Sequence, residues 1–232
     1  NQYKKLFNET RQINIEDIDN IFGKEKVKKN KLTLPKGYES LFRNIEKMFY
    51  KPALEYLLNR GLEKEDVLKY DIHYSVSDQR VLFPSYDREH NLNYYVARSI
   101  QPFENYKYKN AMASKREVIF NEHLIEWHKP LYVVEGIFDA ILSRKNAVPI
   151  LGSNVGSGSL LFKRLLENHT EVIIALDADA KKKMFKMINE LVKYNIPVTY
   201  VDWKNEGRDI AEMGSDKFEE IVTSGIKKYG RN

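Results

Sequence analysis

Three acidic residues follow two short apolar runs, and carboxylates in this arrangement suit the binding of a divalent cation. Glu135 follows the run LYVV at 131–134, while Asp177 and Asp179 follow the run VIIAL at 172–176. Continuous β-branched and apolar runs of this length are typical of strands buried on both faces of a parallel sheet. Ligands of such sheets gather beyond the carboxyl ends of the strands, so we expect the three carboxylates to share one crevice. Because crowded carboxylates repel one another and Mg²⁺ prefers oxygen ligands, the sequence predicts a metal site there.

A helix cap is the simpler explanation for an aspartate that follows a strand. Asp at the start of a helix accepts hydrogen bonds from backbone N–H groups and interacts favourably with the helix dipole. That role accounts for one of Asp177 and Asp179, but not for both together with Glu135. The order of the three acids, each after a predicted buried strand, therefore favours the metal site.

A regular alternation of strands and helices positions these acids. Beyond Pro130 the pattern predicts strands at 131–134, 147–151, 171–176 and 197–203, and helices at 138–145, 159–168, 181–194 and 215–228. Such an alternation is typical of a parallel sheet with right-handed crossovers. The glycine-rich loop GSNVGSG at 152–158 precedes a helix and could hold an anion on its N–H groups. It matches neither a dinucleotide-binding motif nor a P-loop, so a permissive turn explains it equally well.

The chain before Pro130 has a mixed pattern. Helices are expected at 53–60 and 63–70, and two β-rich runs at 80–87 and 92–101 predict a hairpin. We therefore expect an α/β protein in three parts. They are a linker or N-terminal extension at 1–34, a smaller α+β subdomain at 35–129, and a parallel-sheet domain with flanking helices at 130–232.

The stretch YKYKNA at 106–111 interleaves basic and aromatic side chains. This composition suits a single nucleic-acid strand, because cations meet the phosphates while rings stack on the bases. A tyrosine-rich edge strand with exposed lysines explains the same residues. The two interpretations stay open on this stretch alone.

Composition sets only broad limits on function. The 232 residues carry a formal net charge of +5, which is compatible with a polyanionic partner and equally with an ordinary mixed surface. There is no cysteine, so disulfides and cysteine-rich zinc sites are excluded. No apolar run approaches the ~18 residues of a membrane span, and no signal-peptide pattern is present, so we expect a cytoplasmic protein without a membrane partner.

Taken together, the motifs resemble a known family. E-G-x-x-D-A at Glu135–Ala140 and D-x-D at Asp177–Asp179 are similar to the Toprim signature of DnaG-type primases, topoisomerases and some nucleases. The segment ALEYLLNRGLEKEDVLKYDIHY at 53–74, the predicted hairpin and YKYKNA narrow the resemblance to the catalytic core of bacterial or phage DnaG-type primases. The resemblance runs from Pro35 to the end of the chain and implies a Toprim-type parallel sheet.

The resemblance implies roles for five acids. Glu135, Asp177 and Asp179 would be the catalytic residues and the ligands of Mg²⁺ or Mn²⁺. Asp139 would support the site without binding the metal itself. Asp209 resembles the first aspartate of a late D-P-D element and would be a further metal ligand, although Ala211 replaces the second aspartate. A helix N-cap is the alternative role for Asp209.

The resemblance also implies contacts with nucleic acid or nucleotide from residues before the parallel sheet. These residues are Arg60, Arg98, Lys107, Lys109 and Asn110. For Arg60, an equally good explanation is that its positive charge stabilises the C-terminus of a helix. The family's I-F-x-K-G element departs here to IFNEH at 119–123, so we expect its basic role to shift to Lys115 or Arg116.

The function that follows from the resemblance is that of a DNA primase. Such an enzyme is a DNA-directed RNA polymerase that makes short primers for DNA replication by two-metal-type nucleotidyl transfer. Its partners would be a single-stranded DNA template, ribonucleoside triphosphates, a replicative helicase and a separate zinc-binding module, with no zinc in this chain. Two alternatives stay open: strand cleavage by a Toprim nuclease or topoisomerase-like enzyme, and a non-catalytic nucleic-acid-binding module of the replisome.

Overall fold

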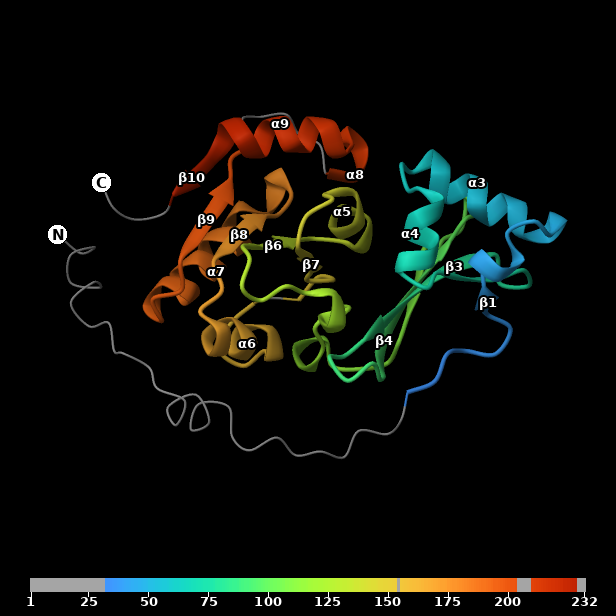
Figure 1. Ribbon diagram of the computed structural model, residues 1–232, viewed down its shortest axis with the longest axis horizontal. Coiled ribbons are helices and arrows are strands. Elements are labelled where there is room, and N and C mark those ends of the chain that lie inside the picture. The colour runs from blue at the N-terminus through green and yellow to red at the C-terminus, as the bar shows by residue number, and fades with distance from the viewer. Residues whose placement is uncertain (1–31, 154, 204–209, 229–232) are drawn as a thin grey trace. The chain divides into compact units, whose positions relative to one another are not determined.

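The structure is a computed structural model that describes residues 32–153, 155–203 and 210–228 (Figure 1). Most of the predicted extension at 1–34 and the predicted ligand Asp209 lie outside the described residues. The described chain divides into two compact units. One contains 115–119 and everything described from Ile125 onward, and we call it the parallel-sheet unit. The other contains residues up to Ser114 together with Phe120–Leu124, and we call it the antiparallel-sheet unit.

The parallel-sheet unit is built on a five-stranded sheet with the strand order β10-β9-β8-β6-β7. Four strands are parallel: β6 (Leu131–Val134), β7 (Ala147–Pro149), β8 (Val172–Ala175) and β9 (Val198–Val201). Every residue of β6 and β8 is buried, which confirms the interpretation of their apolar runs as central strands. The edge strand β10 (Ile226–Lys228) pairs antiparallel with β9.

Among the described residues, the α-helices that accompany this sheet are α5 (Ile137–Leu142), α6 (Leu160–Asn168), α7 (Lys181–Lys193), α8 (Ile210–Met213) and α9 (Ser215–Gly225). Helix α6 begins where the Ser159 hydroxyl accepts a hydrogen bond from the Phe162 N–H at 3.2 Å. The predicted helix at 215–228 is wrong in its last turn. The helix ends at Gly225, and the three following residues form β10 because the exposed edge of β9 offers them backbone partners.

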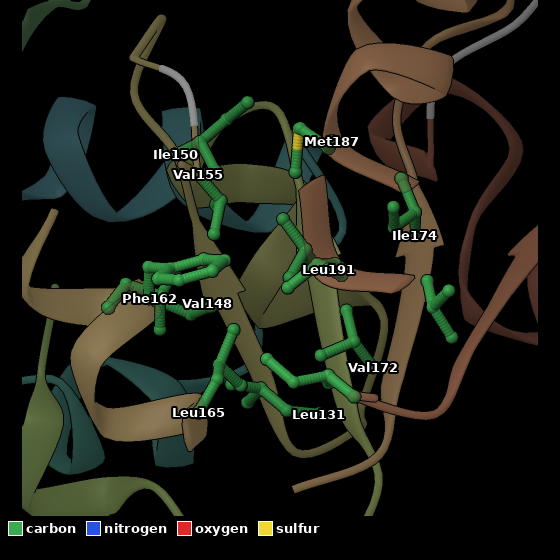
Figure 2. Close-up of a cluster of buried hydrophobic side chains, with 14 of the residues drawn as sticks. Leu131, Val148, Ile150, Val155, Phe162, Leu165, Val172, Ile174, Met187 and Leu191 are labelled. Carbon is green, nitrogen blue, oxygen red and sulfur yellow. The ribbon is translucent and has the colours of Figure 1, made fainter. Parts of the chain in front are cut away.

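The core of this unit follows the alternation of side chains along the strands. Leu131 and Val133 of β6, with Val172 and Ile174 of β8, point to one face, where they pack with buried residues of α6 and α7 (Figure 2). On the opposite face Tyr132 packs edge to face against Phe218 of α9, with ring centroids 6.2 Å apart. Figure 1 shows α5 and α9 on one side of the sheet and α6 on the other. With both faces covered, functional groups of the sheet are left to its edges and strand ends.

The antiparallel-sheet unit contains a second five-stranded sheet in the order β1-β2-β3-β4-β5. Its strands are β1 (Glu39–Ser40), β2 (His73–Ser75), β3 (Arg80–Tyr86), β4 (Leu92–Ser99) and β5 (Tyr108–Asn110). β3 and β4 form the predicted hairpin, and the helices α3 (Lys51–Asn59) and α4 (Lys64–Lys69) match the predicted pair within a few residues. Within YKYKNA, Tyr108–Asn110 form the edge strand β5, so the edge-strand interpretation describes their structure correctly.

No helix within the described ranges has the length and apolar character needed to cross a membrane.

Candidate functional site

The two strands that precede the acids are direct neighbours. β6 and β8 pair in parallel, with Val134 opposite Ala175, so Glu135 and Asp177 follow the carboxyl ends of two neighbouring strands. From β6 the chain continues to β7, its neighbour on one side, whereas β8 and then β9 lie on the other side of β6. The two connections therefore diverge between β6 and β8, which is the topological switch point where open α/β sheets bind their ligands.

Glu135 is held by a lysine. Lys183 of α7 donates to both carboxylate oxygens, at 3.0 Å to Oε1 and 3.3 Å to Oε2. Only 22% of the Lys183 side chain and 23% of the Glu135 side chain are exposed. In this arrangement the negative charge of Glu135 is balanced by an ammonium group.

Asp177 directly precedes the 3-10 helix η5 (Ala178–Ala180), Asp179 is the middle residue of η5, and η5 leads directly into α7. Asp177 is the N-cap residue of η5, yet its side chain makes no capping hydrogen bond, and the N-cap position of α7 is taken by Ala180. Asp179 is exposed and Asp177 is half-buried. The helix-cap explanation therefore does not account for either carboxylate.

Asp139 supports the loop that carries Glu135. It is buried at the third position of α5, and its Oδ2 accepts a hydrogen bond from the Gly136 N–H at 2.9 Å. A Cβ at position 136 would lie 3.0 Å from the same oxygen, so glycine allows this close approach. The interaction fixes the backbone directly after Glu135 and fits the supporting role expected for Asp139.

The donor chemistry of this edge fits a hard divalent cation in part. Carboxylate oxygens are the ligands that Mg²⁺ prefers, and Asp177 and Asp179 supply them. Glu135 does not fit as a ligand in this arrangement, because both of its oxygens bind Lys183. Within the described ranges no group of three or more His, Cys, Asp or Glu side chains could hold a metal ion. Asp209 lies outside those ranges, so the metal site stays a prediction.

The predicted nucleic-acid residues lie in the antiparallel-sheet unit, around β4 and β5. The Arg98 guanidinium donates to the hydroxyl groups of Tyr56, at 2.9 Å, and Tyr108. It also lies over the Tyr108 ring, 4.7 Å from its centroid. Tyr56 and Arg60 are four residues apart around α3, which places Arg60 near the same face.

Lys107, Lys109 and Asn110 differ in their surroundings. Both lysine side chains are exposed, and Lys109 pairs with Asp78 at 3.4 Å. Alternation along β5 directs Lys109 to the face opposite Tyr108. Asn110 lies across from Val96 of β4, and its Oδ1 is buried without a hydrogen-bond partner. The five predicted residues therefore do not form one surface: Arg98 and Asn110 share one face of the sheet, and Lys109 lies on the other.

Sequence reasoning missed Arg80, which organises the loop before β5. Arg80 is 2% exposed and donates to the backbone carbonyls of Tyr106, at 2.5 Å, and Lys107, at 3.0 Å. It also pairs with Glu104 at 3.5 Å. The loop that it holds presents Phe103 and Tyr106, which are 95% and 78% exposed. The sequence signal for this role is a charged arginine as the first residue of the apolar run RVLF at 80–83.

The segment IFNEH at 119–123, where the chain departs from the family's I-F-x-K-G element, is fixed by hydrogen bonds of Asn121. Asn121 is buried, its Oδ1 accepts the Tyr86 N–H at 3.1 Å, and its own N–H donates to Ser85 Oγ at 2.9 Å. Lys115 instead donates to the Leu151 carbonyl at 2.7 Å, and the Leu151 N–H donates to the Glu135 carbonyl at 3.0 Å. The Lys115 ammonium group therefore lies at the end of β7, next to the backbone that pairs with Glu135.

The comparisons with known proteins point to one fold. Neither a family model nor a curated protein matches the sequence. Among solved structures, the DnaG primase catalytic domain bound to ssDNA matches with a TM-score of 0.63 and 17% identity, over 79% of this chain and 77% of that one. A DNA primase domain from Pseudomonas aeruginosa matches with a TM-score of 0.64 and 18% identity, over 80% of this chain and 75% of that one.

The RNA polymerase domain of Mycobacterium tuberculosis primase DnaG gives a TM-score of 0.62 and 16% identity, over 78% of each chain. These matches confirm the predicted fold class, a parallel sheet with flanking helices preceded by a smaller α+β part. The chain therefore has the fold of a DnaG-type primase catalytic core.

Proposed function

We propose that this chain is the catalytic core of a primase, which joins ribonucleotides into short primers on a single-stranded DNA template. One observation carries the proposal: in a chain with the fold of DnaG catalytic cores, the strands that precede Glu135 and Asp177 are neighbours at the switch point of the sheet. Fold alone does not assign chemistry, so the acids at this position are the stronger support.

The acids would serve phosphoryl transfer, which needs charge neutralisation and positioning more than covalent chemistry. Asp177 and Asp179 would hold Mg²⁺ or Mn²⁺, with Asp209 as a further ligand. The bound cation would neutralise the triphosphate of the incoming nucleotide. Glu135, once released from Lys183, would join the ligands or accept the proton of the primer 3′-hydroxyl. Asp139 would keep the Glu135 loop in place through its hydrogen bond to Gly136.

The template strand would contact the antiparallel-sheet unit. Arg60, Arg98, Lys107 and Lys109 would bind phosphates, while the exposed aromatic side chains beside Lys107 would stack on bases. The solved primases with this fold include complexes with ssDNA and with double-stranded DNA. A replicative helicase and a separate zinc-binding module complete the set of proposed partners.

A primer-synthesis assay tests the proposal. The chain is incubated with single-stranded DNA, labelled ribonucleoside triphosphates and Mg²⁺ or Mn²⁺, and the Asp177→Asn/Asp179→Asn double variant is compared with wild type. We expect template-dependent RNA products from wild type and a loss of at least about 100-fold in the variant, because the charge-neutralising ligands are gone. Asp216→Asn, an exposed aspartate of the same unit, is the matched control. Full activity of the double variant would reject the site.

A non-catalytic nucleic-acid-binding module is the second candidate, because Lys183 neutralises the charge of Glu135. It predicts DNA binding that EDTA does not weaken and no RNA product, even with a zinc-binding module added. Incubation of labelled DNA with Mg²⁺ and no nucleotides distinguishes the remaining alternative, since cleavage would indicate a nuclease.

A further inference from the structure

Lys183 is the third of three consecutive lysines at the start of α7, and it differs from the other two. Lys181 and Lys182 are exposed, whereas the Lys183 side chain turns inward and is only 22% exposed. Its Nζ lies 3.0 Å and 3.3 Å from the two oxygens of Glu135, which is 48 residues earlier in the chain. One ammonium group therefore occupies the position between both oxygens of this carboxylate.

The stability of α7 does not explain the position of Lys183. Positive charge is unfavourable in the first turn of a helix, because the helix dipole leaves partial positive charge there. No acidic residue lies in the first turn of α7 to offset the three lysines. Ordering a long lysine side chain also costs conformational entropy. The interaction with Glu135 is the compensating contact that the structure shows for Lys183.

We infer that Lys183 is a built-in counter-cation of Glu135, and that a divalent cation must displace its ammonium group before Glu135 can serve as a ligand. The ammonium and a cation chelated by both oxygens would occupy the same space beside the carboxylate. The inference deepens the proposed function and rests on its metal site. It assigns Lys183 a positioning role: the lysine holds the Glu135 carboxylate until a cation replaces its ammonium group.

Direct titration with Mn²⁺ tests this inference without an activity assay. The full chain is titrated by calorimetry, and free Mn²⁺ is followed in parallel by electron paramagnetic resonance. For Lys183→Met we expect an affinity for Mn²⁺ about three- to tenfold higher than wild type, the size expected when a partly buried competing ion pair is removed. Lys183→Arg keeps a cation at this position and is expected to stay within about twofold of wild type.

The matched control is Lys182→Met. It removes the same charge from the neighbouring residue, whose side chain is exposed, so it measures the general electrostatic effect of one fewer positive charge. We expect an increase in Mn²⁺ affinity of less than about twofold for this control. Circular dichroism on all variants checks that the fold is kept. Equal changes for Lys182→Met and Lys183→Met would overturn the inference, and so would an unchanged or lower affinity in Lys183→Met.

A double-variant cycle isolates the contact with Glu135. In a Glu135→Gln background, Lys183→Met should raise Mn²⁺ affinity by no more than the Lys182→Met control, less than about twofold, because no carboxylate is left to be released. An undiminished effect in that background would show that Lys183 acts elsewhere and would overturn the inference.

Failure of the inference and failure of the proposed function give different results. If wild type binds Mn²⁺ and Lys183→Met changes nothing, only the role of Lys183 falls. If neither protein binds Mn²⁺, the metal site and the inference fall together. If the titrations behave as expected but no primer is made, the inference stands and the proposed function is rejected.

Discussion

At the scale of single residues, Asp71 shows how neighbouring donors keep a partly buried carboxylate charged. Burial alone would raise its pKa, but hydrogen bonds from His73 and from the Tyr86 hydroxyl outweigh that effect, and the pKa of Asp71 is lowered. The Tyr86 Oη–Asp71 Oδ2 distance is 2.7 Å. A carboxyl group with a lowered pKa stabilises the folded state above its unfolded pKa of 3.8. This contribution is lost as the pH falls through the lower, folded pKa.

The substitution Tyr86→Phe should therefore raise the pKa of Asp71, because one of the donors that favour the charged form is removed. Titration of the Asp71 carboxyl carbon by NMR measures this shift directly. We also expect the variant to lose free energy of unfolding at neutral pH, and to differ less from wild type as the pH falls below 3.8.

Tyr106→Phe is the control, since it deletes the same hydroxyl from a side chain that is 78% exposed. An Asp71 pKa that is unchanged in Tyr86→Phe would contradict the assignment of its cause.

The acids of the candidate site could be predicted from the sequence, but their partners could not. Glu135, Asp177 and Asp179 are identifiable because each follows an apolar run that predicts a buried strand. Lys183 is one of three adjacent lysines, and only packing decides which of them turns toward Glu135. The local role of Asn121 was equally hidden, because its partners Ser85 and Tyr86 lie on a strand more than 30 positions earlier.

At the scale of elements, the long helices and the hairpin were predictable, whereas several of the short strands were not. β1, β2 and β10 have two or three residues each, and they exist because a neighbouring strand offers backbone partners. β10 is the clearest example. Its residues continue a helical pattern in the sequence, yet pairing with the edge of β9 overrides that preference.

We expect Arg80 to stabilise the loop that enters β5. Its guanidinium donates to the carbonyl groups of Tyr106 and Lys107, and both hydrogen bonds would be lost in Arg80→Met, although the Lys107 carbonyl would keep the Ser99 N–H as a donor. We expect the free energy of unfolding to fall by about 2–3 kcal/mol, because buried hydrogen bonds from a charged group are lost. Affinity for single-stranded DNA should fall as well, since the exposed Tyr106 and Lys107 would no longer be held in place.

Denaturant unfolding and fluorescence anisotropy with a labelled oligonucleotide measure the two effects. Arg88→Met is the matched control, because the Arg88 side chain is 56% exposed and pairs with its neighbour Glu89. We expect a change within about 0.5 kcal/mol for that control. If Arg80→Met proved as stable as Arg88→Met, Arg80 would not organise the loop.

At the scale of the whole molecule, the chain divides into units that are not continuous in sequence. Residues 115–119 belong to the parallel-sheet unit, although they precede Phe120–Leu124 of the other unit. Ile119 is 1% exposed and is part of the hydrophobic core of the parallel-sheet unit. Hydropathy alone does not reveal such a crossing, since Ile119 and Phe120 are adjacent buried residues that serve different cores.

The positions of the two tryptophans make this division testable. Trp127 and Trp203 both lie in the parallel-sheet unit, so tryptophan fluorescence reports on that unit, whereas far-ultraviolet circular dichroism reports on both. Ile119→Ala should destabilise the parallel-sheet unit by about 2–4 kcal/mol, because it leaves a cavity in a packed core. The fluorescence transition in denaturant should therefore move to lower concentration.

Phe83→Ala is the counterpart, because Phe83 is fully buried in β3 of the antiparallel-sheet unit. If the two units unfold separately, this variant should shift part of the circular dichroism transition and leave the fluorescence midpoint in place. If both variants instead shift both signals by the same amount, the two units unfold as one cooperative block, and the core that contains Ile119 is not independent of the core that contains Phe83.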